Sequence, residues 1–238
     1  MLLFYVRHAQ SANNALYQET GSYDGRNEDP PLSQTGEKQL PYMANYLFQQ
    51  LSEVQADGQG GTRNVPVTLY CSLMQRTVAT ASAIAERCSL PLLGHALIHE
   101  AGGIYLKNEE TGERVGLPGK SKEYFAEHFP LLQYPQDVPA DGWWNKPHEA
   151  REARPERANR VLEDLLMKHS NPDEVVILVS HAEFFNYLAR SILEIPIDST
   201  AWFEVMNCSI SLFDFKDGNI LIPYINRHHF LPAELITG

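Results

Sequence analysis

Basic and polar residues stand directly after three short apolar runs of the sequence, where side chains of this kind could do chemistry. They are Arg7 and His8 after the first run, Ser72 and Arg76 after the second, and His181 after the third. A guanidinium group matches the oxygens of a phosphoryl group two at a time. Two arginines gathered with two histidines therefore predict an anion site, and a phosphoryl group is the anion that suits it best.

Each of these groups comes at the end of a predicted strand that leads into a helix. The three β-rich apolar runs span residues 2–6, 67–70 and 175–179. Short apolar runs that alternate with helical patterns are typical of a parallel sheet flanked by helices. Ligands bind at the carboxyl edge of such a sheet, where helix N-termini present free N–H groups. The three groups are therefore expected to converge at one edge.

Further segments complete the predicted α/β fold. Apolar residues in 40–51 recur at helical spacing, and Pro41 predicts a kink or a late start of that helix. A second helix is predicted over 155–169, because proline suits the first turn of a helix. Near the end, the runs 210–215 and 220–225 flank an Asp-Gly turn, which predicts an antiparallel hairpin.

The regular pattern is interrupted over about residues 101–148, which are rich in glycine and proline. A long irregular stretch inside a compact domain is more often a functional cover than a plain connector. Neither a linker nor an internal repeat divides the rest of the sequence. We therefore expect a single domain over residues 1–238, with an insertion or cover at about 101–148.

The composition of the 238 residues is that of an ordinary globular protein, with 43% hydrophobic and 21% charged residues. Thirty acidic against nineteen basic side chains give a formal net charge of −11, which disfavours nucleic acid as a partner. The apolar runs are too short to cross a bilayer, and the N-terminus lacks the pattern of a signal peptide. A cytoplasmic protein without a membrane or nucleic-acid partner is expected.

The three cysteines have no metal-binding spacing and are expected to be reduced, buried residues. A metal site is the natural alternative for a chain with nine histidines. However, His8 and His181 belong to different units, and His228 and His229 are adjacent, so neither pair suggests a chelate. The sequence predicts no bound metal and no cofactor. His95, His99, His128, His148 and His169 are expected in loops or at the surface.

An ordered set of motifs resembles the histidine phosphatase superfamily, in its phosphoglycerate mutase-like branch. The matching segments are 7–11 (RHAQS) with Asn14, 29–33 (DPPLS) with Gly36 and Gln39, 70–72 (YCS) with Arg76, Thr77, Thr80 and Ala81, Glu100 after the strand-like 92–98, 179–181 (VSH), and 207–210 (NCSI). The resemblance implies a three-layer α/β sandwich with a mostly parallel sheet between helices. It also implies a histidine acid phosphatase-like hydrolase of phosphoric monoesters, which acts on a small phosphorylated substrate.

The resemblance also implies roles for individual residues. His8 is similar in position to the nucleophile that becomes a phosphohistidine, and Glu100 to the acid that protonates the leaving oxygen. The remaining phosphate-binding residues are expected to be Arg7, Arg76, a protonated His181, Asn14, Ala182 and Arg26. Positive charge on the arginines would replace a metal ion at the transition state.

Glu183 leaves the choice of acid open. It is either an acidic residue that favours the N-terminus of its helix, or the proton donor in place of Glu100. Ala9 and Gln10 depart mildly from the motif, and Gln10 is expected at the rim of the pocket. A phosphoglycerate mutase carries an adjacent arginine pair that this sequence lacks, which favours a phosphatase. A mutase and a phosphoester-binding homologue without catalysis remain the alternatives.

Several residues have two interpretations. Trp143 and Trp144 are either a cover over the core or a wall of the substrate pocket, and the sequence favours neither. Arg151 and Arg154 are expected on a solvated helix face. Tyr23 joins Arg26 as an expected contact at the rim. The oligomeric state is left open, a homodimer included.

Overall fold

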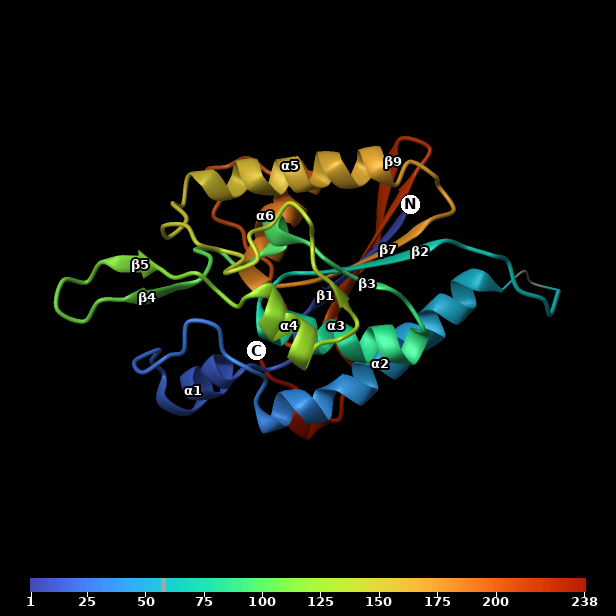
Figure 1. Cartoon of the computed structure of the whole chain (residues 1–238). Helices are drawn as coiled ribbons and strands as arrows, with labels where there is room; N and C mark the ends of the chain where they lie inside the picture. Colours follow the sequence, from blue (N-terminus) through green and yellow to red (C-terminus); the bar gives the residue numbers. More distant parts are fainter. Residues whose placement is uncertain (57–58) are drawn as a thin grey trace.

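The computed structural model describes residues 1–56 and 59–238, and a seven-stranded sheet forms its centre (Figure 1). The strands are β1 (Leu2–Arg7), β2 (Val67–Cys71), β3 (Leu92–Gly94), β6 (Leu132–Gln133), β7 (Val175–Ser180), β8 (Ile210–Lys216) and β9 (Asn219–Arg227). Their order across the sheet is β6-β3-β2-β7-β1-β8-β9. Pairs from β6 to β1 are parallel, and the pairs that involve β8 or β9 are antiparallel. The predicted mostly parallel sheet and the C-terminal hairpin are confirmed.

Helices cover both faces of the sheet and make three layers (Figure 1). α2 (Gln34–Gln55) and α3 (Gln75–Cys88) pack on one face, and α5 (Ala153–Lys168) and α6 (Ala182–Ile192) pack on the other. In β1, Phe4 and Val6 face the first layer, whereas Leu3 and Tyr5 face the second. Burial on both sides explains why these strands are continuous apolar runs in the sequence. The predicted α/β sandwich is confirmed.

The register of the central strands aligns the ends of β1, β2 and β7. Arg7 pairs with Ser180, and Cys71 pairs with Val179, so the three strands stop at the same level of the sheet. The residues that follow them, such as His8 and His181, consequently meet at one edge. This register is the physical reason that groups far apart in the sequence form one site.

Helix α2 begins before Pro41, and therefore earlier than the late start that was one of the two predictions for this helix. Ser33 caps it and accepts a hydrogen bond from the Gly36 amide, so the helix starts at Gln34 and continues through Pro41. The expectation of a late start at Pro41 is wrong. The N-cap and a row of buried residues that includes Met43 and Leu47 outweigh the backbone hydrogen bond that proline cannot donate.

The segment between about residues 101 and 148 contains short elements. β4 (Tyr105–Lys107) and β5 (Arg114–Gly116) form an antiparallel hairpin, which extends away from the rest of the fold on the left of Figure 1. The seven-residue helix α4 (Lys122–His128) follows, and β6 then joins the edge of the main sheet beside β3. Helix α1 (Ala12–Thr20) and two 3-10 turns, at Ala96–Ile98 and Ala233–Leu235, complete the elements of the described residues. The strand-like stretch 92–98 is therefore a strand only as far as Gly94.

The paired tryptophans of this segment belong to the core. Trp143 and Trp144 are 3% and 6% exposed and pack in the same cluster as α3. Their side chains fill the space beside Gly119 and Gly103, both of which have positive φ, so a Cβ there would collide with an indole. Of the two interpretations that the sequence allowed, the structure supports a cover over the core.

Candidate active site

The nucleophile predicted from the sequence, His8, lies immediately after β1. Its amide donates to the Ser180 carbonyl at 3.0 Å, and the Arg7 amide donates to the Ser209 carbonyl at 3.0 Å. These bonds tie the strand end to both of its neighbours. Helix α1 (Ala12–Thr20) then begins at Ser11, whose side chain and that of Asn14 form a capping box. The loop that carries His8 is thus fixed on both sides.

Hydrogen bonds determine which nitrogen of His8 carries the proton. Nδ1 lies 2.7 Å from the Ala9 carbonyl oxygen, which can only accept, so Nδ1 is protonated. Nε2 accepts from Nε of Arg76 at 3.2 Å and is therefore unprotonated. Burial, Arg76 and Arg7 lower the pKa of His8 well below its ordinary value of 6.5. His8 is a neutral imidazole with an unprotonated Nε2, the form that a nucleophile requires.

Arg76 also contacts the second histidine. Its Nη2 donates to Nδ1 of His181 at 3.1 Å, and Nε2 of His181 lies 3.0 Å from the Ser72 hydroxyl. Burial, followed by the charge of Arg76, lowers the pKa of His181 well below 6.5. His181 is thus neutral in this structure, and the expectation of a protonated imidazole is wrong here. Burial removes the water that would stabilise a charged ring, and the cationic Arg76 beside His181 opposes a second positive charge.

A buried carboxylate holds Arg76 from the other side. Oδ1 of Asp29 lies 3.8 Å from Nη1 of Arg76 and accepts from the Gln75 amide at 3.1 Å. Burial raises the pKa of Asp29 to about 6, against the effect of Arg76. Arg7 is held by a hydrogen bond from Nη1 to the Val205 carbonyl, and its Nε has no partner in the described part of the chain. The two guanidinium groups are therefore fixed, with donors to spare.

Asn14 has only its amide nitrogen left to offer to a ligand. Its Oδ1 accepts from the Ser11 amide at 3.1 Å, from the Ser11 hydroxyl at 2.9 Å and from Asn207 at 3.4 Å. The side-chain oxygen is thus committed to the cap of α1. This orientation makes Asn14 a donor, in agreement with the expected role.

The two candidate acids lie side by side at the N-terminus of α6. Oε1 of Glu100 accepts from the amides of Ala101 at 2.9 Å and Phe184 at 3.1 Å, and its Oε2 accepts from the Glu183 amide at 3.4 Å. Glu183 instead pairs with Arg154 at 2.5 Å, and its side chain is 41% exposed. Burial and the neighbouring charge of Glu100 raise the pKa of Glu183, while Arg154 opposes this shift.

A cavity of about 430 Å³ brings these groups together. Its walls include the predicted residues Arg7, His8, Asn14, Tyr23, Arg26, Arg76, Glu100, Ala182 and Glu183. His181 has no exposed surface and contacts the site through Arg76. Arg26 donates to the Tyr105 hydroxyl at 3.1 Å and lies over its ring, which places it at the rim. The arrangement presents fixed positive charge around one nucleophilic nitrogen, with carboxylates nearby.

The hairpin β4–β5 supplies wall residues that the sequence pattern did not indicate, namely Tyr105 and Arg114. Strands of three residues carry no usable periodicity, so their position over the site has no signal in the sequence.

Gln10 was expected at the rim of the pocket, but the structure buries it. It is 4% exposed and bonds Ser33 at 2.6 Å, because it connects the loop after His8 to the start of α2.

Some basic residues are less exposed than the sequence suggested. Arg154 is 8% exposed and bonds Glu183, so the solvated face expected for it is wrong, whereas Arg151 is exposed as expected. His99 and His169 are also buried rather than at the surface. His99 packs against Trp144, and His169 bonds Glu174 at 2.7 Å. The contacts of Arg154 and His99 join residues far apart in the sequence, so a local pattern does not reveal them.

Other kinds of site were also considered. Among residues 1–56 and 59–238, no group of three or more histidine, cysteine or acidic side chains is arranged to hold a metal ion. In the same residues, every helix is too short or too polar to cross a membrane.

Comparisons with known proteins place this site in a family. A search of curated proteins gives no match. A phosphoserine phosphatase of Entamoeba histolytica, solved with phosphoserine, is 18% identical, with a TM-score of 0.56 over 97% of this chain and 99% of that one. A mycobacterial glucosyl-3-phosphoglycerate phosphatase is 17% identical, with a TM-score of 0.57 over 95% and 99%. YhfR of Bacillus stearothermophilus is 16% identical, with a TM-score of 0.58 over 97% and 99%.

These solved structures share the fold of this chain along nearly its whole length. The family model of the histidine phosphatase superfamily (branch 1) matches residues 3–228, which include His8 and all the residues that line the cavity. The resemblance that the motifs indicated is therefore confirmed, and this chain belongs to the histidine phosphatase superfamily.

Proposed function

We propose that this protein hydrolyses phosphomonoesters of small metabolites through a phosphohistidine on His8, without the need for a metal ion. The observation that carries the proposal is the state of His8. Its Nε2 is unprotonated and lies 3.2 Å from the Arg76 guanidinium, in a cavity that Arg7 also lines. A neutral nucleophile held against two cations is suited to attack a dianionic phosphoryl group.

In the first step, Nε2 of His8 attacks phosphorus and the ester P–O bond breaks. Negative charge develops on the three equatorial oxygens, which Arg7, Arg76 and the amide of Asn14 are positioned to stabilise. The Nδ1 proton of His8 stays on the bond to the Ala9 carbonyl, which stabilises the cationic ring of the phosphohistidine. In the second step, water attacks phosphorus, the N–P bond breaks and inorganic phosphate leaves.

We assign the proton transfers to Glu100. It donates a proton to the leaving alkoxide in the first step and recovers one from the attacking water in the second. Glu183 is the weaker choice, because its carboxylate is already engaged by Arg154 at 2.5 Å and is 41% exposed to solvent.

The names of the similar structures agree with this proposal. Two are phosphatases, one of phosphoserine and one of glucosyl-3-phosphoglycerate. Both names describe small phosphorylated metabolites, and a cavity of about 430 Å³ is large enough for esters of that kind.

Phosphorus NMR of the purified protein in excess chelator tests the proposal. The substrates are a panel of phosphomonoesters that includes phosphoserine, and phosphoglycerate with a trace of bisphosphoglycerate. Release of free phosphate is the expected result, and a chelator should not diminish it. Migration of phosphate between the glycerate positions would identify a mutase instead. Binding of the esters without release would identify a non-catalytic homologue, and either result would overturn the proposal.

A further inference from the structure

Two more cavities continue outward from the candidate active site. A middle cavity of about 390 Å³ shares Tyr105, Arg114 and Glu183 with the site. An outer cavity of about 470 Å³ in turn shares Arg151, Tyr187 and Trp202 with the middle one. Because each pair of neighbours shares lining residues, the three cavities follow one another from the site at His8 to the end of α6. Together they offer more room than the cavity of about 430 Å³ at His8 alone.

The middle cavity is positively charged. Its walls contain three arginines and a histidine, Arg114, His148, Arg151 and Arg154, and the single acid Glu183. Arg154 neutralises Glu183 at 2.5 Å, which leaves Arg114 and Arg151 as surplus charge. Nη1 of Arg114 lies 3.3 Å from Nε2 of His148, and both arginines are exposed. The chemistry of these walls suits a second anionic group.

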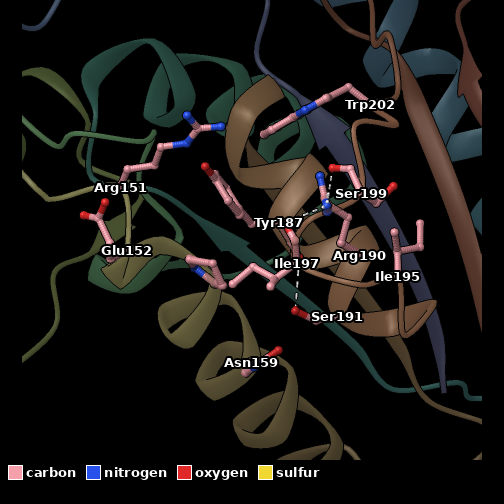
Figure 2. Close-up of a pocket in the computed structure, with 11 residues that line it drawn as sticks. Arg151, Glu152, Asn159, Tyr187, Arg190, Ser191, Ile195, Ile197, Ser199 and Trp202 are labelled. Atoms are coloured by element: carbon pink, nitrogen blue, oxygen red, sulfur yellow. Dashed lines mark hydrogen bonds between the residues drawn. The ribbon is translucent and has the colours of Figure 1, made fainter.

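The outer cavity combines two aromatic rings, Tyr187 and Trp202, and aliphatic side chains with polar and charged residues. Trp202 is 44% exposed, and its ring meets that of Tyr187 edge to face at 5.5 Å. Figure 2 shows the guanidinium of Arg151, the hydroxyl end of Tyr187 and the indole of Trp202 pointing toward one another. Glu152, the chain neighbour of Arg151, also lines this cavity, and its carboxylate would repel an anion there. The outer cavity therefore suits a flat, uncharged group rather than a further phosphate.

Arg190 fixes the loop that leads to Trp202 and also lies against the indole ring. The guanidinium of Arg190 donates to the carbonyls of Pro196 and Ser199, each at 2.8 Å, and lies 5.4 Å from the Trp202 ring. Arg190 is 8% exposed, so its donors serve the loop and not a ligand. A loop that is fixed in this way offers the indole as a ready surface for stacking.

We propose that the preferred substrates are phosphomonoesters whose leaving group carries a second anion and ends in an aromatic ring. This inference rests on the proposed function for the reacting phosphate. The scissile phosphate lies at His8, the second anion lies between Arg114 and Arg151, and the ring stacks on Trp202. The three parts of the substrate match the three cavities in order.

Binding and turnover of adenosine 3′,5′-bisphosphate test the proposal. The matched ligands are adenosine 5′-monophosphate, which lacks the second anion, and glycerol 3-phosphate, which also lacks the ring. Of the three tryptophans of the chain, only Trp202 is exposed, so quenching of tryptophan fluorescence reports a ring at the outer cavity. We expect the bisphosphate to bind about tenfold or more tightly than the monophosphate, which is the effect of one well-placed charge pair.

Two variants and two controls locate the effect. Arg151→Ala and Trp202→Ala should each raise the KM for the bisphosphate about tenfold and leave turnover of p-nitrophenyl phosphate unchanged. Arg160→Ala removes an exposed arginine of α5 outside the cavities, and Tyr42→Ala removes an equally exposed ring of α2, so neither should alter the KM.

Equal affinity for the two nucleotides, or a bisphosphate KM that is unchanged in both cavity variants, would overturn this substrate class. Failure of the proposed function is distinguishable, because p-nitrophenyl phosphate would then release no phosphate. The fluorescence titration would still report in that case whether the outer cavity binds the ring. The absence of quenching by either nucleotide at millimolar concentration would overturn the proposal for the outer cavity.

Discussion

At the scale of single residues, Arg76 organises the site. Its three nitrogens reach three different groups, His8 at 3.2 Å, His181 at 3.1 Å and Asp29 at 3.8 Å. Two imidazoles that would otherwise compete for protons are both kept neutral by this one guanidinium, with burial the larger cause. The nucleophilic form of His8 is consequently the resting form of the protein and not a minor state.

The first prediction concerns His8 itself. His8→Ala should lower kcat by at least about 10³-fold, because the covalent route is lost and water must attack the ester directly. Phosphate affinity and the melting temperature should change little, since Arg7 and Arg76 remain. Phosphate release and a thermal melt measure the two effects. Steady-state turnover close to that of the wild type would exclude the phosphohistidine.

A second prediction separates the two acids. Glu100→Gln should reduce kcat by about 10²-fold or more on an ester with a poor leaving group, and much less on p-nitrophenyl phosphate, whose leaving group needs no proton. Glu183→Gln should have a small effect on both, because its carboxylate is paired with Arg154. The ratio of kcat values for the two esters is the measurement. The opposite ranking would assign the acid to Glu183.

At the scale of elements, the start of α2 supports the loop that follows His8. The Ser33 amide donates to the Gln10 carbonyl at 2.9 Å, and Gln39 accepts from the Gln10 amide at 2.8 Å. Gly36 lies against this loop so closely that a Cβ would stand 2.1 Å from the Gln10 carbonyl oxygen. The site is thus shaped by a helix that contributes no side chain to the cavity.

Gly36→Ala is therefore predicted to act on both stability and activity. The added methyl group must displace the Gln10 backbone, which should cost about 1–3 kcal/mol of the free energy of unfolding. Because Gln10 is two residues from His8, kcat/KM should fall as well. Lys38→Ala, at an exposed position of the same helix, should change stability by less than about 0.5 kcal/mol. Denaturant unfolding and initial rates provide the comparison, and a fully active, equally stable Gly36→Ala protein would contradict this account.

The sequence predicts the elements that bury a face and misses the ones that do not. β1 and β7 are buried on both sides and β2 is partly buried, so each is a mainly apolar run, and the polar residues at their ends could be recognised as a site. The hairpin β4–β5 buries little and leaves no pattern, so Tyr105 and Arg114 could not be placed over the site. The burial of Arg154 could likewise not be predicted, because its partner Glu183 is 29 residues away on another helix. Local periodicity predicts burial but not which distant side chains meet.

At the scale of the whole molecule, buried histidines connect stability to pH. The pKa values of His8, His99 and His181 lie well below 6.5, mainly because of burial. Below about pH 6.5 the unfolded chain takes up protons at these residues and the folded chain does not. The free energy of unfolding therefore decreases as the pH is lowered. The pKa of Asp29 is raised from 3.8 to about 6, so between these two pH values the folded chain binds the extra proton. Asp29 therefore raises the free energy of unfolding as the pH is lowered.

Five imidazoles with lowered pKa values, those of His8, His95, His99, His148 and His181, outnumber the raised carboxyls of Asp29 and Glu183, which predicts a loss of stability in mild acid. Each imidazole that stays neutral in the folded chain contributes about 1.4 kcal/mol per pH unit below about pH 6. His99→Gln, which is outside the catalytic machinery, should reduce that slope by about one proton. Denaturant unfolding at a series of pH values measures the slope. A flat stability between pH 6.5 and 5 would show that these histidines are protonated in the folded chain.

The distribution of charge has a kinetic consequence. The molecule carries a net charge of −11, yet six arginines line the site and the adjacent middle cavity, namely Arg7, Arg26, Arg76, Arg114, Arg151 and Arg154. An anionic ester is repelled from most of the surface and attracted to these arginines. Association with the site is therefore faster, and its rate depends on how strongly salt screens the charges. Added salt should lower kcat/KM far more than kcat, and most for esters with two anions. Substrate preferences measured at high ionic strength would therefore understate the selectivity of the protein.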